Sequence, residues 1–160
     1  MSNSKFFNIL GNELSLAEVV AAIYEFVKTK PQRKYKIIVG TDSAARAEVN
    51  FITAITIWRV GNGGIHFWTR SEKTICHDLR ERIYKETIHS ITLAEELRGR
   101  LKDSLGDEFF WNDQIHIDVG ENGPTREFID TVVGMVKGYG FDAVIKPNSF
   151  GASVVADRHT

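Results

Sequence analysis

Acidic side chains follow two predicted strands at the points where those strands end. Asp42 follows segment 35–41 in Gly40-Thr41-Asp42-Ser43, and Asp118 lies near the end of segment 114–119. If the two strands are parallel neighbours, roughly 4.8 Å apart, their carboxylates converge at one edge of the sheet. Two like charges that close together repel unless a cation lies between them. A single aspartate at a strand end commonly caps a turn, but the pair favours a divalent-metal site.

Glu86 is the third acid, and helical spacing predicts that it faces the core. Spacings of four and three place one stripe of residues down a helix over 77–105, namely Leu79, Ile83, Glu86, Ser90, Leu93, Leu97 and Leu101. Glu81 and Glu95 fall off this stripe and are predicted to face solvent. Burying a carboxylate without a partner is costly, so we expect either a metal ion beside Glu86 or a salt bridge with Arg82 or Arg126.

The fourth acid is Asp157, in Ala156-Asp157-Arg158-His159-Thr160 at the carboxyl terminus. Terminal residues are often frayed, so a site role and a frayed end both stay open. His116 alternates with two isoleucines and is expected on the side of Asp118, although a hydrogen-bonded strand histidine is the plainer interpretation. The polar residues expected to support the acids or contact a substrate are Ser43, His116, Asn122, Arg126, Lys146, Arg158 and His159.

The elements that must position these residues are predicted from periodicity and from turn and cap signals. Ser15 and Glu18 form a capping box that opens a helix over about 16–28. Gly61-Asn62-Gly63-Gly64 joins two β-rich segments as a hairpin. The expected strands are 35–41, 51–60, 65–70, 114–119 and 141–146, and the later helices are 77–105, about 124–137 and 150–157. This order predicts an α/β fold: a mixed five-stranded sheet, in which a three-strand antiparallel meander is followed by parallel strands, with flanking helices.

The glycine-rich segment 120–126 leads into a predicted helix and is therefore a possible anion site. It lacks the lysine and the glycine spacing of a phosphate-binding P-loop. A tight strand-to-helix turn explains it well enough and is the favoured interpretation.

Length and composition restrict the class of protein. A chain of 160 residues suits one domain, 1–160. The lone Cys76 excludes an internal disulfide and a thiol-only zinc site, and the histidines show no zinc-binding spacing. The sequence has neither a secretion signal nor the roughly 18 apolar residues of a membrane helix, so we expect a cytoplasmic location without membrane contact.

A formal net charge of −1 implies that any nucleic-acid contact comes from a local basic patch rather than from the whole surface. The candidate cations are scattered, and such charges commonly form a plain solvated surface. They are Arg33, Lys34, Lys36, Arg70, Lys73, Arg80, Arg82, Lys85 and Arg158.

Several of these motifs together resemble those of the bacterial YkuK-type family. The resemblance begins at 38–43, continues through 79–90 and 116–123, and closes at 145–153 and 156–158. Members of that family are placed in the ribonuclease H-like superfamily and have no assigned biological role. The superfamily pattern, carried over, implies a four-acid site of Asp42, Glu86, Asp118 and Asp157.

The resemblance implies two Mg²⁺ or Mn²⁺ ions, which in such sites activate water and stabilise the departing oxygen of a phosphodiester. The leading hypothesis is therefore a metal-dependent nuclease acting on RNA or structured nucleic acid. The sequence lacks an obvious basic handle for a hybrid duplex, which leaves RNA, DNA and hybrid all open as substrate. The alternatives are a non-catalytic nucleic-acid- or protein-binding module and, less favoured, a nucleotide-binding domain, because actin-like ATPases need two such domains.

Overall fold

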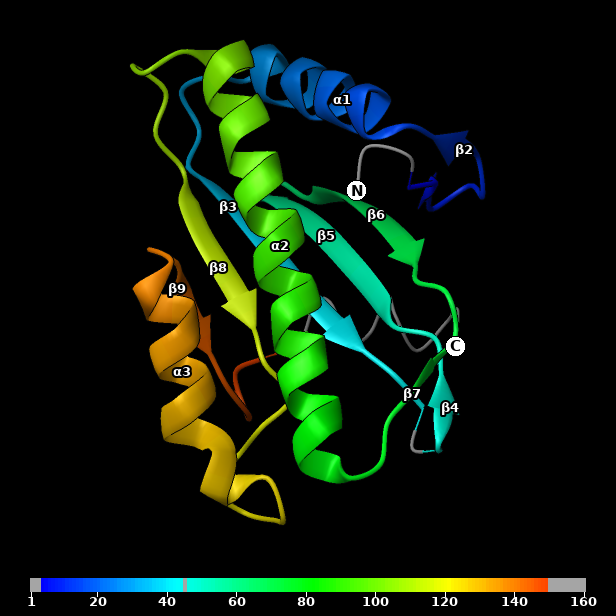
Figure 1. Cartoon of the computed structure of the whole chain (residues 1–160). Helices are drawn as coiled ribbons and strands as arrows, with labels where there is room; N and C mark the ends of the chain where they lie inside the picture. Colours follow the sequence, from blue (N-terminus) through cyan, green and yellow to red (C-terminus); the bar gives the residue numbers. More distant parts are fainter. Residues whose placement is uncertain (1–3, 45, 150–160) are drawn as a thin grey trace.

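The computed structural model describes residues 4–44 and 46–149, and these form a mixed sheet with three α-helices on one face (Figure 1). The sheet strands are β1 (Phe6–Asn8), β2 (Glu13–Leu14), β3 (Tyr35–Asp42), β5 (Ile52–Arg59), β6 (Gly64–Arg70), β8 (Asn112–His116) and β9 (Asp142–Val144). The helices are α1 (Leu16–Thr29), α2 (Leu79–Leu105) and α3 (Ile129–Gly138), with a short 3₁₀ turn η1 (Arg126–Phe128). A separate pair of short strands consists of β4 (Glu48–Val49) and β7 (Thr74–Ile75).

The strand order is β2-β1-β6-β5-β3-β8-β9. The meander β3–β5–β6 is antiparallel, and β8 and β9 continue the sheet in parallel with β3, as the sequence predicts. The predicted count of five strands is wrong, because β1 and β2 extend the sheet beyond β6. These two strands are too short to show alternation and depend on contacts such as Phe7 opposite Trp68. The N-terminal helix consequently follows two strands of the sheet instead of preceding all of it.

The ends of the helices follow local signals. The Ser15 hydroxyl accepts from the Glu18 amide at 3.1 Å, and the Glu18 carboxylate accepts from the Ser15 amide at 3.0 Å, so the predicted capping box is present. Asp78 caps α2, which therefore begins two residues later than predicted. The helix expected from Pro124 also begins later, because Thr125 first closes a turn by accepting the Gly120 amide at 3.1 Å.

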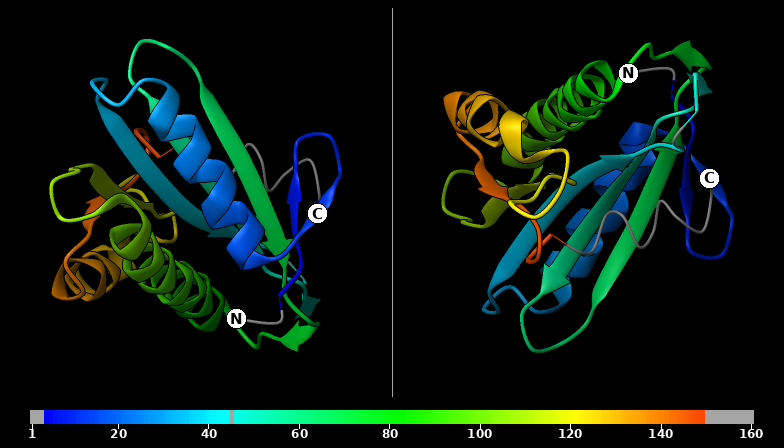
Figure 2. Two further views of the ribbon diagram at one scale, coloured as in Figure 1. Left: turned by 90° about the horizontal axis from the view of Figure 1, so that it is seen from above. Right: turned by 90° about the horizontal axis from the view of Figure 1, so that it is seen from below.

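The main core lies between the sheet and the three helices (Figure 2). Buried sheet residues on the helix side include Ile37, Val39, Ile55, Ile57 and Ile115. They pack with the apolar stripe of α2, of which Leu93, Leu97 and Leu101 are at most 1% exposed. Burial of this stripe holds α2 across β3 and β8, with its first half beside the carboxyl ends of both strands. No helix in the described part of the chain is long and apolar enough to cross a membrane.

Candidate functional site

Asp42 and Asp118 lie at the same level on neighbouring parallel segments. Gly40 of β3 is paired with His116 of β8, so two further residues on each segment lead to Asp42 and Asp118. The strand β8 ends at His116, before the predicted end, and Asp118 belongs to the following loop. That segment is still held to the sheet because the Ile117 amide donates to the Val144 carbonyl at 2.9 Å. Both aspartates are half-buried.

Glu86 reaches this edge of the sheet from α2. It is 6% exposed, as its place on the apolar stripe predicts. The Ser43 hydroxyl donates to Glu86 Oε2 at 2.7 Å, while the Ser43 amide donates to Asp42 Oδ1 at 2.9 Å. Ser43 therefore fixes two acidic side chains, one through its hydroxyl and one through its backbone.

Burial and like charges act together on Glu86. Its pKa is raised from 4.5 to about 8, and desolvation is the largest cause. The hydrogen bond from Ser43 opposes this rise, and the charges of Asp42 and Asp118 contribute to it. The positive charge of Arg82 lowers the pKa only slightly by comparison. Among the described residues Glu86 forms no ion pair with an arginine, so the salt-bridge alternative is absent from this part of the chain. Glu95, in contrast, is exposed, and Glu81 pairs with Lys85 at 2.8 Å.

Buried hydroxyls beneath the carboxylates join α2 to the sheet. Thr41 Oγ1 lies 2.7 Å from Ser90 Oγ and 3.0 Å from Thr53 Oγ1. All three residues are buried. Together with Glu86 and Asp118, Thr41 and Ser90 line a narrow crevice between α2 and the β3–β8 edge. The only sequence signal of this contact is Ser90, the other polar residue on the apolar stripe.

Lys146 places a positive charge on the site. Its ammonium lies 2.8 Å from Asp118 Oδ1, and the two side chains are 53% and 40% exposed. The Lys146 amide donates to the Val119 carbonyl at 2.9 Å, which fixes the backbone of this loop beside the acid. A Cβ at Gly120 would meet the Lys146 Cβ at 3.0 Å, so a glycine at 120 leaves room for the lysine stem.

The remaining sequence candidates lie in different surroundings. His116 is 6% exposed and hydrogen-bonds Gln114 at 3.1 Å, and burial followed by the charge of Lys36 lowers its pKa to about 4. It is therefore a neutral strand histidine at pH 7. Asn122 is exposed and shares a surface pocket of about 440 Å³ with Lys146. Arg126 is exposed at the start of η1. Asp157, Arg158 and His159 lie outside the described residues.

The chemistry of the donor set fits a hard divalent cation, because Mg²⁺ and Mn²⁺ prefer carboxylate oxygens. In residues 4–44 and 46–149, no three acidic, histidine or cysteine side chains converge closely enough to hold an ion as they stand. Asp118 is engaged by Lys146, whose ammonium supplies positive charge at that carboxylate. The three acids thus have suitable oxygens and adjacent positions, and Lys146 competes for one of them.

Comparison with known proteins defines the class to which this fold belongs. A family model described as ribonuclease H-like matches residues 18–160. The chain belongs to this family. It is also 31% identical over 167 residues to a Bacillus subtilis (strain 168) protein named "Uncharacterized protein YkuK", and the alignment covers 97% of this chain and 96% of that protein. These findings confirm the resemblance seen in the sequence motifs. No solved structure matches the chain.

Proposed function

We propose that this protein is a divalent-metal-dependent phosphodiester hydrolase that acts on RNA or structured nucleic acid. Asp42, Glu86 and Asp118 would hold Mg²⁺ or Mn²⁺, and Asp157, outside the described residues, would complete the set as the family pattern implies. Membership of the ribonuclease H-like family supports the class of reaction. The identity of the metal and the number of ions belong to the proposal.

The observation that carries the proposal is the buried carboxyl group of Glu86. The negative charges of Asp42 and Asp118 oppose its ionisation. A carboxylate that is 6% exposed and raised to a pKa of about 8 is costly to keep ionised without a cation. Stability alone would favour an apolar residue at this position of the stripe. A bound cation would keep Glu86 ionised, because all three acids attract it together. Such a cation would account for an acid at this position of the stripe.

The chain's own residues would divide the remaining tasks. Bound ions of this kind supply Lewis-acid stabilisation of phosphoryl oxygens and lower the pKa of a water. Ser43 keeps Glu86 and Asp42 in fixed orientations through its two hydrogen bonds. Thr41 and Ser90 fix the distance between α2 and β3 beneath the acids. Lys146, displaced from Asp118 by an ion, would be available to a phosphate oxygen of the substrate.

A cleavage assay with paired variants tests the proposal. Micromolar protein at low salt is incubated with Mn²⁺ and a mixture of RNA, DNA and hybrid oligonucleotides. We expect slow cleavage of at least one substrate, which chelation stops. Asp42→Asn should reduce the rate at least about a hundredfold, the scale of losing one charge-stabilising group. Asp103→Asn, which neutralises an exposed acid late in α2, is the matched control. Cleavage that survives Asp42→Asn would come from a contaminant.

The ion pair of Lys146 with Asp118 favours a second candidate, a nucleic-acid-binding module that keeps the fold without the reaction. A protein that never binds metal there would gain from an internal counter-charge at 2.8 Å. Oligonucleotide binding without cleavage under every metal tested, together with an unchanged melting temperature on metal addition, would select this module.

A further inference from the structure

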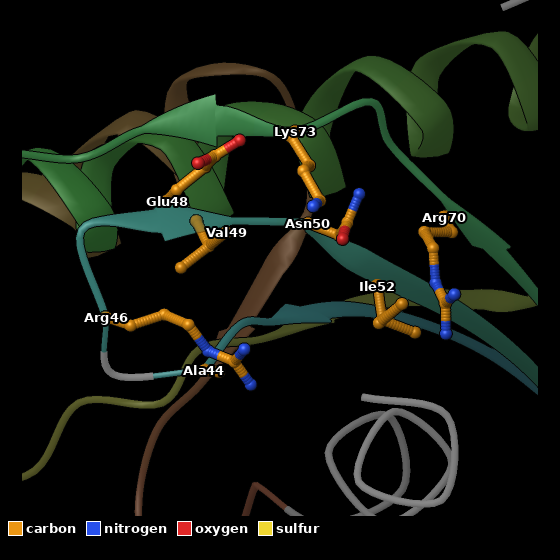
Figure 3. Close-up of a pocket in the computed structure, with 8 residues that line it drawn as sticks. All are labelled: Ala44, Arg46, Glu48, Val49, Asn50, Ile52, Arg70 and Lys73. Carbon is orange, nitrogen blue, oxygen red and sulfur yellow. The ribbon is translucent and has the colours of Figure 1, made fainter.

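A basic pocket lies beside the carboxylate site, at the end of β3 and on the side of β5 rather than of β8. It has a volume of about 300 Å³ and is bounded by the segment leading into β4, the start of β5 and the segment leading into β7. Figure 3 shows Arg46 and Arg70 at opposite ends of this pocket, with Lys73 between them. Its floor includes Val49 and Ile52, which are 2% and 0% exposed.

The strand register sets the distance of the pocket from the site. Asp42 is directly opposite Ile52, and Ile52 is directly opposite Arg70. Residues directly opposite one another across a sheet project from the same face, so Asp42 and Arg70 project from one face. Two strand spacings separate their backbones by roughly 10 Å. Along a duplex strand, where phosphates recur about every 3.4 Å of axis, that distance spans about three phosphates.

The pocket is braced by hydrogen bonds, one of which ties it to α2, the helix that holds Glu86. The Arg46 carbonyl accepts from Arg82 Nη2 at 2.9 Å, and Arg82 lies one helical turn before Glu86 on α2. The Ala47 carbonyl accepts from the Cys76 amide at 2.8 Å, which joins the ends of β4 and β7. The backbone of Arg46 is therefore held to α2. Arg46 also follows by three residues Ser43, the residue that fixes Glu86 and Asp42.

The far side of the pocket is fixed as well. The Asn50 side-chain Nδ2 donates to the Ser71 carbonyl at 2.8 Å, and the Ser71 hydroxyl accepts from the Phe51 backbone amide at 2.8 Å. The Arg70 guanidinium lies 5.9 Å over the ring of Trp68, which orients its planar group. Arg70 is thus held in β6, whereas Arg46 and Lys73 lie in the short segments that lead into β4 and β7.

The charge of the pocket contrasts with that of the chain. The whole protein has a net charge of −1, but three basic side chains and one acid, Glu48, line this pocket among the residues that the structure describes. Among the described residues, Arg46 and Lys73 take part in no ion pair. Two guanidinium groups and an ammonium around a fixed concavity favour an anion with several acceptor oxygens, which is the chemistry of a phosphate.

We infer that the pocket of Arg46, Arg70 and Lys73 binds a backbone phosphate of a nucleic-acid strand, roughly 10 Å from the carboxylate site. The choice of nucleic acid rests on the proposed function, whereas the pocket and its charge do not. The pocket supplies the local patch that a chain of near-neutral charge requires for such a partner. The pocket would also orient the nucleic-acid strand, because a phosphate held on one side of Asp42 sets the direction in which the strand runs past the carboxylate site.

Binding of a labelled oligonucleotide in the presence of a chelator tests this inference without any cleavage. The probes are a short fluorescein-labelled single-stranded RNA and the same RNA annealed to complementary DNA, measured by fluorescence anisotropy over a series of salt concentrations. The test variant is Arg46→Gln/Lys73→Gln. The matched control is Lys102→Gln/Lys137→Gln, which removes the same charge from exposed lysines in the last turns of α2 and α3. Figure 1 shows the last turn of α2 at the opposite end of the molecule from β4 and β7, and the last turn of α3 on the opposite side of the sheet's width.

We expect the test variant to bind the preferred probe on the order of tenfold more weakly at low salt, because two of the three cations around the bound phosphate are lost. Its plot of log affinity against log salt should be shallower by roughly 0.7 to 0.9, the contribution of one phosphate. The control should match the wild type. Equal weakening of both variants, no weakening of either, or no binding of either probe by the wild type would overturn the inference.

Cleavage by the wild type with Mn²⁺, measured separately, judges the proposed function. Weakened binding of the test variant without wild-type cleavage would leave the phosphate pocket standing and remove the hydrolase. Wild-type cleavage with unchanged binding of the test variant would do the reverse.

Discussion

Replacing Glu86 by glutamine should stabilise the metal-free protein at alkaline pH. The pKa of Glu86 is raised from 4.5 to about 8, so the folded chain binds this proton more tightly than the unfolded chain does. Ionisation therefore opposes folding: the penalty is absent below about pH 4.5, grows as the pH rises, and is complete above about pH 8. At about 1.4 kcal/mol for each pH unit, the ceiling is about 5 kcal/mol.

Relaxation around a buried charge reduces that ceiling, and we expect Glu86→Gln to gain about 2 kcal/mol at pH 8. For a domain of this size, 1 kcal/mol corresponds to about 2–4 °C, so the melting temperature should rise by about 4–8 °C. At about pH 5 most of the gain should be gone, because the wild-type carboxyl is then protonated in the folded state. Thermal unfolding in the presence of a chelator at both pH values measures the difference, with exposed Glu95→Gln as control.

Adding Mn²⁺ reverses the advantage. The wild type should gain stability because only its folded state assembles the acids, whereas Glu86→Gln should lose most of that gain. A variant that is less stable than the wild type at pH 8 would refute the reasoning, and so would a gain of equal size at pH 5. In either case the ionisation of Glu86 would not destabilise the folded protein.

Three further substitutions test the surroundings of the site. Lys146→Met should lower the Mn²⁺ concentration for half-maximal stabilisation, because no ammonium then competes for Asp118. In the presence of a chelator, its free energy of unfolding should differ from that of the wild type by at most about 1 kcal/mol. An unchanged half-maximal concentration would contradict that competition. Thr41→Val should cost about 1–3 kcal/mol in urea unfolding, because the Ser90 and Thr53 hydroxyls lose their buried partner. Leu97→Ala should cost about 2–5 kcal/mol, because Leu97 is 1% exposed in the core; a loss below 1 kcal/mol would refute its packing role.

Local patterns in the sequence were sufficient for much of the fold. The capping box of Ser15 and Glu18, the hairpin at 61–64 and the stripe of α2 each depend on residues a few positions apart, so one short segment contains the whole signal. The same periodicity placed Glu86 in the interior without any knowledge of its partners. Parallel pairing of β3 and β8 followed from the order of elements, and it brought Asp42 and Asp118 level.

Only the tertiary structure decided which distant groups meet. The short strand β1 exists through its pairing with β6, some 60 residues later, because three residues cannot specify a strand by themselves. The contacts of Lys146 with Asp118 and of Thr41 with Ser90 likewise join segments without a shared local pattern. The basic pocket combines cations from before β4, from the last residue of β6 and from the segment that follows β6, which look scattered along the chain. Such sites depend on the register and packing of whole elements, and those depend on the free energy of the complete core.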